Sequence, residues 1–241
     1  MIYTYNSRVR YSEIDENARM TLFSLVNNLQ DCCTFHGEAV GVGLAWNMER
    51  GQAWVVADLQ MHVRQYPRFG DRIRVMTWAV GFRGMVAQRD FRVELEDGTF
   101  LAEAATDWVF MDMIHRKPIR IPEEQGAYGV HPEKTLTQDL GKRKVRPPQE
   151  MEEKEHFQIQ EYHLDTNRHV NNAQYVRMAM RHLPPGFEAR HIRVEFKKQA
   201  LLGDEIVPYV YVSEAGDAVY VKLADPAGDT YFIGEFTEPS C

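Results

Sequence analysis

The chain of 241 residues contains only three cysteines, and their arrangement excludes two common uses of this residue. Cys32 and Cys33 are adjacent, and Cys241 lies far from both in the sequence. A disulfide framework needs several paired cysteines, and a structural zinc site usually shows a CxxC spacing, which the sequence lacks. We therefore expect neither a disulfide-stabilised fold nor a zinc site of this kind. We also expect no other metal and no cofactor.

Long apolar runs and an excess of basic residues are also missing. No apolar run approaches the roughly 18 residues that indicate a membrane-spanning helix. The first residues, MIYTYNSRVRYSE, lack the apolar core of a secretion signal. We therefore expect a cytoplasmic protein without membrane association. The net charge of −7 argues against broad nucleic-acid binding, although it leaves room for a local basic patch.

The composition is that of an ordinary globular protein. Hydrophobic residues make up 44% of the chain and charged residues 26%. The length is enough for one large domain or two small ones, and either can bury a substantial core.

One short stretch, HLDTNRHVNNAQYV at residues 163–176, is unusually polar for a segment that leads into a helix. Carboxylates, imidazoles and carboxamides are the groups that activate water and orient a carbonyl. A helix N-cap within a solvated turn accounts for the same residue types. Five such side chains fall within eight positions: Asp165, Asn167, His169, Asn171 and Asn172.

The order of predicted elements occurs twice. The first series has a strand at 5–11, a helix at 21–40, then strands at 53–63, 72–82, 85–95 and 100–113. A stretch rich in Pro, Gly and charged residues follows, with a short helix predicted at 122–128. The second series has a strand and turn at 156–165, a helix at 171–183, then strands at 191–200, 205–216, 218–228 and 230–238.

Two motifs repeat in the same order in both series. The motif D-x-N-x-R-M at residues 15–20 matches D-x-N-x-H-V at residues 165–170, at an offset of 150. The Gly-Asp pair at 70–71 matches the pair at 203–204, at an offset of 133. The sequence therefore predicts one unit of strand, long helix and antiparallel sheet that occurs twice, which is an α+β arrangement.

The matching stretches resemble a known family. AWVVADLQMHVRQYPRFGD with RIRVMTW, AATDWVFMDM with HRKPIRIP, and LDTNRHVNNAQYV are similar to the acyl-acyl carrier protein thioesterases, in their bacterial branch. The resemblance implies two tandem hotdog domains, each a long helix wrapped by a curved antiparallel β-sheet. It also implies hydrolysis of the thioester that links a fatty acyl group to acyl carrier protein.

The family's division of labour gives the expected domains. We expect an N-terminal hotdog with the acyl-chain pocket at residues 1–133, a linker at 134–154, and a C-terminal hotdog with the catalytic residues at 155–241. Two fused hotdogs can pair with each other, so a monomer and a homodimer through exposed sheet edges both remain open.

The resemblance implies catalytic roles in the second copy. Asp165 would activate water or hold the groups that do, Asn167 would orient the carbonyl or the water, and His169 would orient water or transfer a proton. The first copy carries Asp15 and Asn17 at the matching places, so a structural role for Asp and Asn stays open. His169 has no such counterpart, because Arg19 takes its place.

A fourth catalytic candidate departs from the family pattern. Plant relatives carry a Glu that is proposed to be catalytic where this sequence reads KKQA, with Gln199. A carboxamide cannot act as a base, but it can donate and accept hydrogen bonds and so position the attacking water. Ala200 follows it, which excludes a cysteine nucleophile at that position.

The resemblance also implies substrate-binding residues. Backbone N–H groups of Val170 and Asn171, near the helix start, are the nearest candidates for an oxyanion hole. The acyl pocket is expected between the first helix and its sheet, and plain core packing explains the same apolar residues. The candidates are Leu22, Leu25, Val26, Leu29, Trp46, Trp54 and Val56.

Basic residues cluster locally in this acidic chain. The groups are Arg116, Lys117 and Arg120; Lys142, Arg143, Lys144 and Arg146; and Lys197 with Lys198. A basic dock would speed encounter with the acidic acyl carrier protein, and a solvated face is the alternative. Two other functions stay open: an acyl-CoA thioesterase and a non-catalytic acyl-binding hotdog protein.

Overall fold

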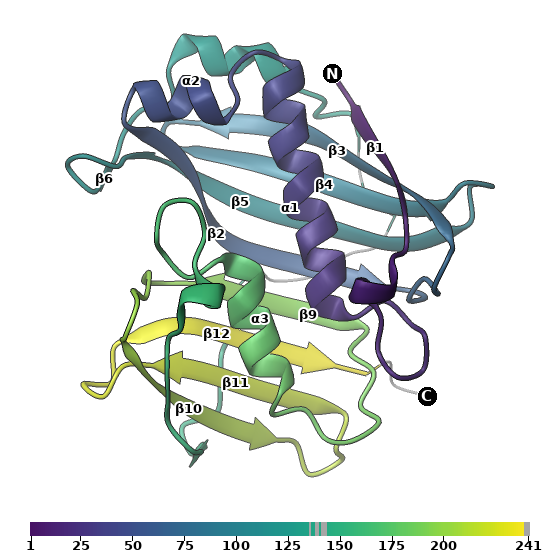
Figure 1. Ribbon diagram of the computed structural model, residues 1–241, viewed down its shortest axis with the longest axis vertical. Coiled ribbons are helices and arrows are strands. Elements are labelled where there is room, and N and C mark those ends of the chain that lie inside the picture. Colours follow the sequence, from purple (N-terminus) through teal and green to yellow (C-terminus); the bar gives the residue numbers. More distant parts are fainter. Residues whose placement is uncertain (135, 138–139, 141–143, 239–241) are drawn as a thin grey trace. The chain divides into compact units, whose positions relative to one another are not determined.

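The computed structural model describes residues 1–134, 136–137, 140 and 144–238. The chain forms two compact units. The first unit comprises Met1–Ala57 and His62–Asp139, and the second comprises Asp58–Met61 and Leu140–Cys241. Each unit contains one long helix and an antiparallel sheet (Figure 1).

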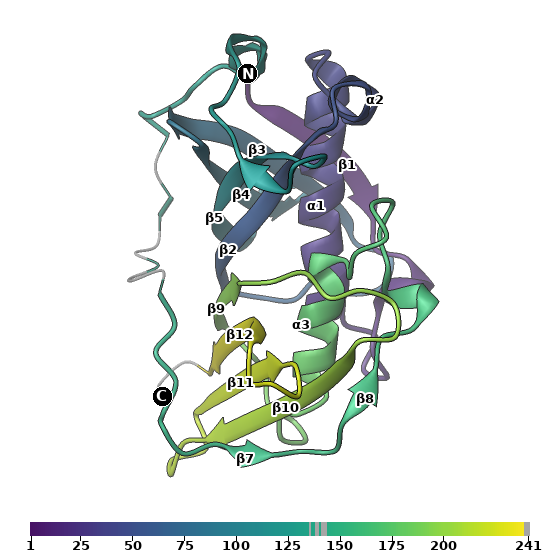
Figure 2. The same cartoon turned by 90° about the vertical axis from the view of Figure 1, so that its left-hand side faces the viewer.

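The strands of the first unit follow the order β1-β3-β4-β5-β2, and β6 also pairs with β5. Helix α1 lies against one face of this sheet (Figure 2). A bulge interrupts the β3–β4 ladder between Ala79 and Gly81, and bulges of this kind bend a strand. The elements are β1 (Tyr3–Arg8), α1 (Leu22–Ala39), α2 (Leu44–Glu49), β2 (Gln52–Val63), β3 (Arg72–Arg83), β4 (Val86–Leu95), β5 (Phe100–Asp112) and β6 (Lys117–Pro118), with 3₁₀ turns at Tyr11–Glu13 and Glu123–Tyr128.

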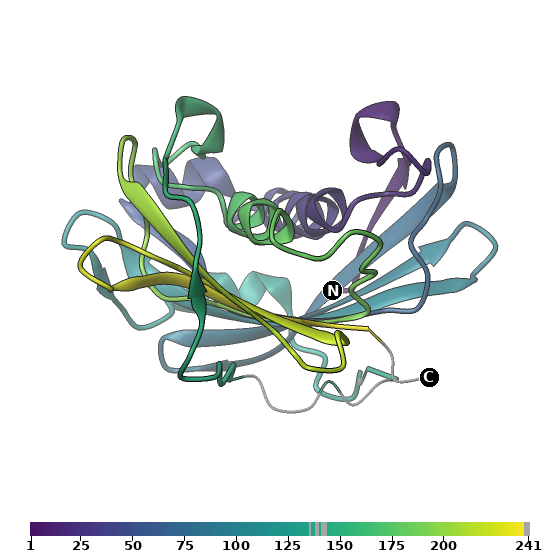
Figure 3. The same cartoon turned by 90° about the horizontal axis from the view of Figure 1, so that it is seen from below.

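The second unit repeats this plan on a smaller scale. Its strands follow the order β9-β12-β11-β10-β7, and β8 also pairs with β10. Helix α3 lies against the sheet, and each sheet curves around its own helix (Figure 3). The elements are β7 (Glu152–Glu153), β8 (Phe157–Gln158), a 3₁₀ turn (Glu161–His163), α3 (Asn172–Met180), β9 (His191–Phe196), β10 (Glu205–Val212), β11 (Ala218–Ala224) and β12 (Thr230–Thr237). The predicted α+β class is thereby confirmed.

Helix α1 forms where apolar spacing and end signals agree. Thr21 caps its N-terminus, with its hydroxyl oxygen accepting a hydrogen bond from Ser24 N–H at 3.1 Å. The helix ends before Gly41, whose φ of +79° favours glycine. The prediction of a helix at 21–40 is confirmed. The six-residue α2 was not predicted, because so short a helix shows little periodicity.

Two predicted elements of the second unit end early, and this matters for the site. The helix predicted at 171–183 ends at Met180, and the strand predicted at 191–200 ends at Phe196. After Phe196 the chain leaves the hydrogen-bond ladder between β9 and β12, because the N–H groups of Lys197 and Lys198 both donate to the Tyr231 carbonyl, at 2.8 and 3.4 Å. Residue 199 therefore lies in an irregular segment rather than in a strand.

The internal repeat is reproduced at the level of single hydrogen bonds. Val9 N–H donates to the Asp71 carbonyl at 2.9 Å, and Ile159 N–H donates to the Asp204 carbonyl at 2.9 Å. The glycines that precede these two aspartates have φ of +86° and +83°. Each aspartate carboxylate also accepts a backbone N–H three residues earlier, at 2.8 and 2.9 Å. Both offsets read from the sequence are therefore confirmed.

Parts of the predicted linker are tied to the outer sheet faces. Thr137 donates from its N–H and its hydroxyl to the buried carboxylate of Glu103, both at 2.8 Å. Val145 N–H donates to the Glu195 carboxylate at 2.8 Å. In the part of the chain that the structure describes, no helix combines the length and apolarity needed to cross a membrane.

A histidine clamp joins the short strands of the second unit to β10. The imidazole of His156 contacts the carboxylates of Glu153 and Glu205, at 3.0 and 2.9 Å. Hydrogen bonds to Glu153 first, and then to Glu205, raise the pKa of His156 above its ordinary value. Protonation of His156 therefore stabilises the folded state. This stabilisation is complete below the pKa of the unfolded state, about 6.5, and it is lost as the pH rises through the higher pKa of the folded state.

We therefore expect His156→Gln to lower the thermal midpoint at about pH 6 and to have little effect at about pH 9. The three side chains are exposed, so the difference should be small and should shrink further in high salt. Thermal unfolding of both proteins at the two pH values checks this. An equal difference at both pH values would show that the charge on His156 is irrelevant.

Candidate functional site

The polar loop of the second unit is organised around one carboxylate oxygen. Asp165 Oδ1 accepts the N–H groups of Asn167 at 2.8 Å and His169 at 3.1 Å. Asp165 N–H donates to the His169 carbonyl at 2.8 Å, and Arg168 has φ of +61° in the tight turn. No residue that the structure describes donates to Asp165 Oδ2, so this oxygen is available to water or substrate.

The first unit builds the same loop. Asp15 Oδ1 accepts the N–H groups of Asn17 and Arg19, both at 2.9 Å. Ala18, at the turn position, has φ of +58°. The aspartate therefore has a structural role in both copies, as the residue that closes the loop. A catalytic role for Asp165 has to come from its second oxygen.

His169 differs from this shared scaffold through its side chain. The residue is half-buried, and Nδ1 of its ring is buried without any hydrogen-bond partner among the described residues. A buried polar atom that no protein group satisfies can be satisfied by a water or a bound molecule. Because the loop holds only the backbone of His169, its ring is free to serve a bound molecule.

Asn167 and Gln199 are both exposed, and the structure brings their segments together. Gln199 directly precedes Ala200, whose carbonyl accepts Val170 N–H at 3.1 Å. This hydrogen bond therefore links the residue that follows His169 to the residue that follows Gln199. The structure joins all four predicted catalytic residues to one loop and its neighbour.

The predicted oxyanion donors need correction. Val170 N–H is bonded to the Ala200 carbonyl, and Asn171 N–H donates to the His163 carbonyl at 2.9 Å. Both groups hold the loop in place, so neither is available to a substrate oxygen. The same two bonds occur in the first unit, which shows that they belong to the scaffold.

The start of α3 offers a different donor. Asn171 is the N-cap, and its side-chain Oδ1 accepts Ala173 N–H at 2.8 Å. Gln174 N–H donates to the Asn171 carbonyl at 2.9 Å. The N–H group of Asn172, which follows the N-cap residue in the sequence, has no hydrogen-bond acceptor among the residues that the structure describes. It lies at the positive end of α3, where an anionic oxygen is stabilised.

Most of the predicted acyl-pocket residues are packed in the core of the first unit. Trp46 is half-buried and packs against a small cluster around Tyr128. The helix residues are between 0% and 6% exposed, as expected for side chains that hold α1 on its sheet. These are Leu22, Leu25, Val26 and Leu29, and Val56 of β2 is buried with them.

Trp54 is the predicted residue that lines a cavity of the first unit. The cavity measures about 20 Å³, which is room for one water, so an acyl chain could enter only if side chains moved. Trp54 donates from its indole N–H to Gln125 Oε1 at 3.0 Å. Tyr128 and the half-buried Cys33 contribute to the same wall.

Sequence reasoning missed a buried basic pair beside this cavity. Arg89 lines it and is 6% exposed, and its guanidinium lies 3.0 Å from Nδ1 of the fully buried His36 and 4.8 Å from the centre of the Tyr128 ring. Desolvation, with the Arg89 charge, lowers the pKa of His36 to about 3. The ring is therefore neutral and accepts from Arg89. The two residues are far apart in the sequence, so spacing gave no signal.

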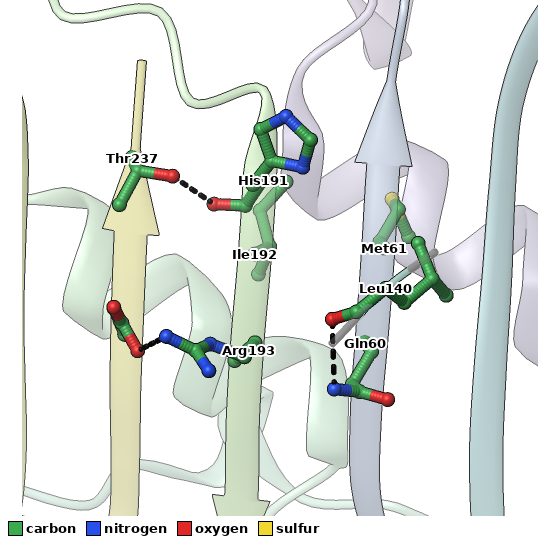
Figure 4. Close-up of a pocket in the computed structure, with 8 residues that line it drawn as sticks. Gln60, Met61, Leu140, His191, Ile192, Arg193 and Thr237 are labelled. Carbon is green, nitrogen blue, oxygen red and sulfur yellow. Dashed lines mark hydrogen bonds and ion pairs between the residues drawn. The ribbon is translucent and has the colours of Figure 1, made fainter. Parts of the chain in front are cut away.

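A larger cavity, of about 200 Å³, lies on the sheet face of the second unit that points away from α3 (Figure 4). Its polar groups are already used: Arg193 pairs with Glu235 at 2.5 Å, and Gln60 donates to the Leu140 carbonyl at 3.2 Å. None of the predicted catalytic residues lines it. We therefore do not assign the site to this cavity.

The predicted basic groups differ in their exposure and in their ion pairs with carboxylates. Arg116, Lys117 and Arg120 are all exposed. Lys198 pairs with Asp225 at 2.7 Å, and Lys197 pairs with Glu195, so carboxylates of the same unit compensate their charges. In the linker group, Lys144 and Arg146 are exposed, whereas Lys142 and Arg143 lie outside the described residues, as does Cys241.

A helix held in a curved antiparallel sheet, with a polar loop at the helix start, defines a hotdog domain, and this chain carries two. The chain belongs to the acyl-ACP thioesterase family. The model of the family's N-terminal domain matches residues 1–128, and that of its C-terminal domain matches residues 146–226. Family and fold predictions are confirmed, while the predicted domain limits at residues 133 and 154 stay a prediction.

Individual relatives agree with this assignment. A chloroplastic acyl-[acyl-carrier-protein] hydrolase of Cuphea viscosissima is 28% identical over 200 residues, which is 77% of this chain and 48% of that protein. A dodecanoyl-[acyl-carrier-protein] hydrolase of Cinnamomum camphora is 26% identical over 232 residues, which is 88% of this chain and 60% of that protein. The chain thus spans about half the length of the curated relatives it matches.

Solved structures show the same fold. An acyl-ACP thioesterase from Bacteroides thetaiotaomicron matches with a TM-score of 0.82 at 21% identity, covering 98% of this chain and 97% of the other. The 12:0-ACP thioesterase from Umbellularia californica matches with a TM-score of 0.81 at 19% identity, covering 99% and 98%.

Proposed function

We propose that this protein hydrolyses the thioester of fatty acyl-acyl carrier protein and releases a free fatty acid. The observation that carries this proposal is the difference between the two loops. Both units build the same aspartate-closed loop, but only the second unit has an imidazole at this position, His169, and its buried ring nitrogen has no partner within the described ranges of the chain. In a chain of this family, a polar side chain that the fold does not use supports a role in the reaction.

The proposed mechanism uses the groups that the scaffold leaves available. A water held by Asp165 Oδ2 and by the carboxamide of Gln199 attacks the thioester carbonyl carbon, and Asp165 accepts the water's proton. Asn167 and His169 orient the water and the carbonyl. The carbonyl oxygen becomes negative in the tetrahedral intermediate and receives the N–H of Asn172. The C–S bond then breaks, and the leaving thiolate takes up the proton that Asp165 accepted from the water, which returns Asp165 to its carboxylate form.

We assign acyl-chain binding to the first unit, as the family's division of labour implies. The small cavity beside Trp54 supports this assignment, because it leaves some space next to a residue predicted to line the acyl pocket. The buried guanidinium of Arg89 makes part of its wall polar, so the cavity would accept the chain only after rearrangement.

The proposed partner is acyl carrier protein, in the cytoplasm. The exposed group of Arg116, Lys117 and Arg120 supports a basic dock, since no ion pair with a carboxylate is found for it among the described residues, unlike Lys197 and Lys198. Such a dock would increase the association rate with an acidic carrier and would lose this effect in high salt.

The test is a comparison of carriers. Purified protein is given acyl-acyl carrier protein and acyl-CoA with chains of 8 to 18 carbons, and the release of free thiol is followed. We expect turnover with the acyl carrier protein substrates and a higher kcat/KM for them than for the matched acyl-CoA. Turnover of acyl-CoA alone would identify an acyl-CoA thioesterase. Binding of acyl ligand without turnover of either substrate would identify a non-catalytic acyl-binding protein.

A further inference from the structure

A buried tyrosine hydroxyl holds the segment that carries Gln199. Tyr175, in the first turn of α3, is 2% exposed. Its hydroxyl oxygen accepts Ala200 N–H at 2.8 Å, and the Lys198 carbonyl lies 3.5 Å away, which makes that contact the weaker of the two. The hydroxyl therefore contacts the backbone on both sides of Gln199.

The ring of Tyr175 is itself fixed. It lies parallel to the ring of Phe232, with centroids 6.0 Å apart and an interplanar angle of 4°, and the ring of Phe196 is 6.2 Å away. Burial raises the pKa of the phenol, so the hydroxyl stays neutral at every physiological pH. A hydroxyl held in this way is a rigid anchor for a segment that has left the ladder of β9.

The first unit shows that the fold does not require this anchor. At the matching positions it carries Leu25 in place of Tyr175 and Pro67 in place of Ala200. Leucine has no hydroxyl and proline has no N–H, so neither half of the hydrogen bond exists there. The loop is nevertheless closed in the same way, because Met20 N–H donates to the Pro67 carbonyl at 2.8 Å. The anchor thus occurs only in the unit that carries His169.

We propose that Tyr175 is a positioning residue for Gln199, and this inference rests on the proposed function. Gln199 is exposed, and no hydrogen bond to its side chain is found within the described part of the chain. Its carboxamide can orient a water only if the backbone below it is fixed. Small displacements of positioning groups lower rates strongly. The Tyr175 hydroxyl supplies the missing restraint through the Ala200 amide.

The test is a double-mutant cycle on acyl-acyl carrier protein hydrolysis, with Tyr175→Phe, Gln199→Ala and both together. Tyr175→Phe keeps the ring and removes only the hydroxyl. We expect it to lower kcat about tenfold with KM within about twofold, and we expect almost no further loss when Gln199 is already Ala. Additive effects in the double variant would overturn the proposal. So would full kcat in Tyr175→Phe, or full kcat in Gln199→Ala.

A control and an independent measurement keep the test decisive. Tyr220 donates from its hydroxyl to Glu235 at 3.0 Å on the other face of the same sheet, so Tyr220→Phe should keep full kcat. Amide exchange in the unaltered protein tests the anchor even if Tyr175→Phe does not fold: the Ala200 amide should exchange slowly, and fast exchange would overturn the proposal. If the unaltered protein hydrolyses no thioester, the proposed function fails instead, whatever the variants do.

Discussion

Replacing Asp165 by Asn is expected to lower kcat by about 10²–10⁴-fold while the protein stays folded. The amide oxygen of Asn can still accept the N–H groups of Asn167 and His169, so the loop remains closed. The variant loses the negative charge and the second carboxylate oxygen, which are the features that the mechanism uses to take the proton from water. Steady-state hydrolysis of acyl-acyl carrier protein, with thermal unfolding beside it, checks both parts.

The first unit provides a matched control for this substitution. Asp15 accepts two N–H groups in the same geometry, so Asp15→Asn changes the scaffold in the same way without touching the proposed chemistry. We expect both variants to lose similar stability and only Asp165→Asn to lose activity. Full activity in Asp165→Asn would remove this residue from the mechanism and leave it a purely structural role.

Replacing His169 by Ala is expected to lower kcat by about 10²–10³-fold with little loss of stability. The loop holds His169 by its backbone, and its buried Nδ1 has no partner among the described residues, so the fold loses few interactions when the ring is removed. The matched control is Arg19→Ala in the first unit, where activity should be unchanged. Unchanged kcat in His169→Ala would show that the ring is not needed for the reaction.

Local interactions explain why much of the fold could be predicted. The Gly-Asp pairs at 70–71 and 203–204 form the same turn, because glycine adopts positive φ and the aspartate bonds to a nearby N–H. Within the two loops, the hydrogen bonds that the carboxylates of Asp15 and Asp165 accept span four residues at most. Helix α1 follows from its apolar spacing and the Thr21 cap. These contacts are short in sequence, so a motif contains all their partners.

The oxyanion prediction was wrong for the opposite reason. Whether Val170 N–H is free depends on the Ala200 carbonyl, 30 positions later in the sequence, which a motif at the helix start does not contain. In the same way, the helical stretch around Tyr175 does not contain the group that its hydroxyl binds, because the Ala200 amide lies 25 positions later. The pairing of His36 with Arg89 joins residues 53 positions apart.

By its resemblance to known proteins the sequence indicated the family, and by itself it determined the repeated unit and the small set of polar residues in the second copy. It determined them because periodicity, turn residues and motif spacing are local properties that a linear sequence displays directly. Only the tertiary structure decided that the scaffold already uses the N–H group of Val170, because its acceptor, the Ala200 carbonyl, comes from another segment. Whether a backbone group already has a hydrogen-bond partner depends on the folded structure, because such partners come from segments that meet only after folding.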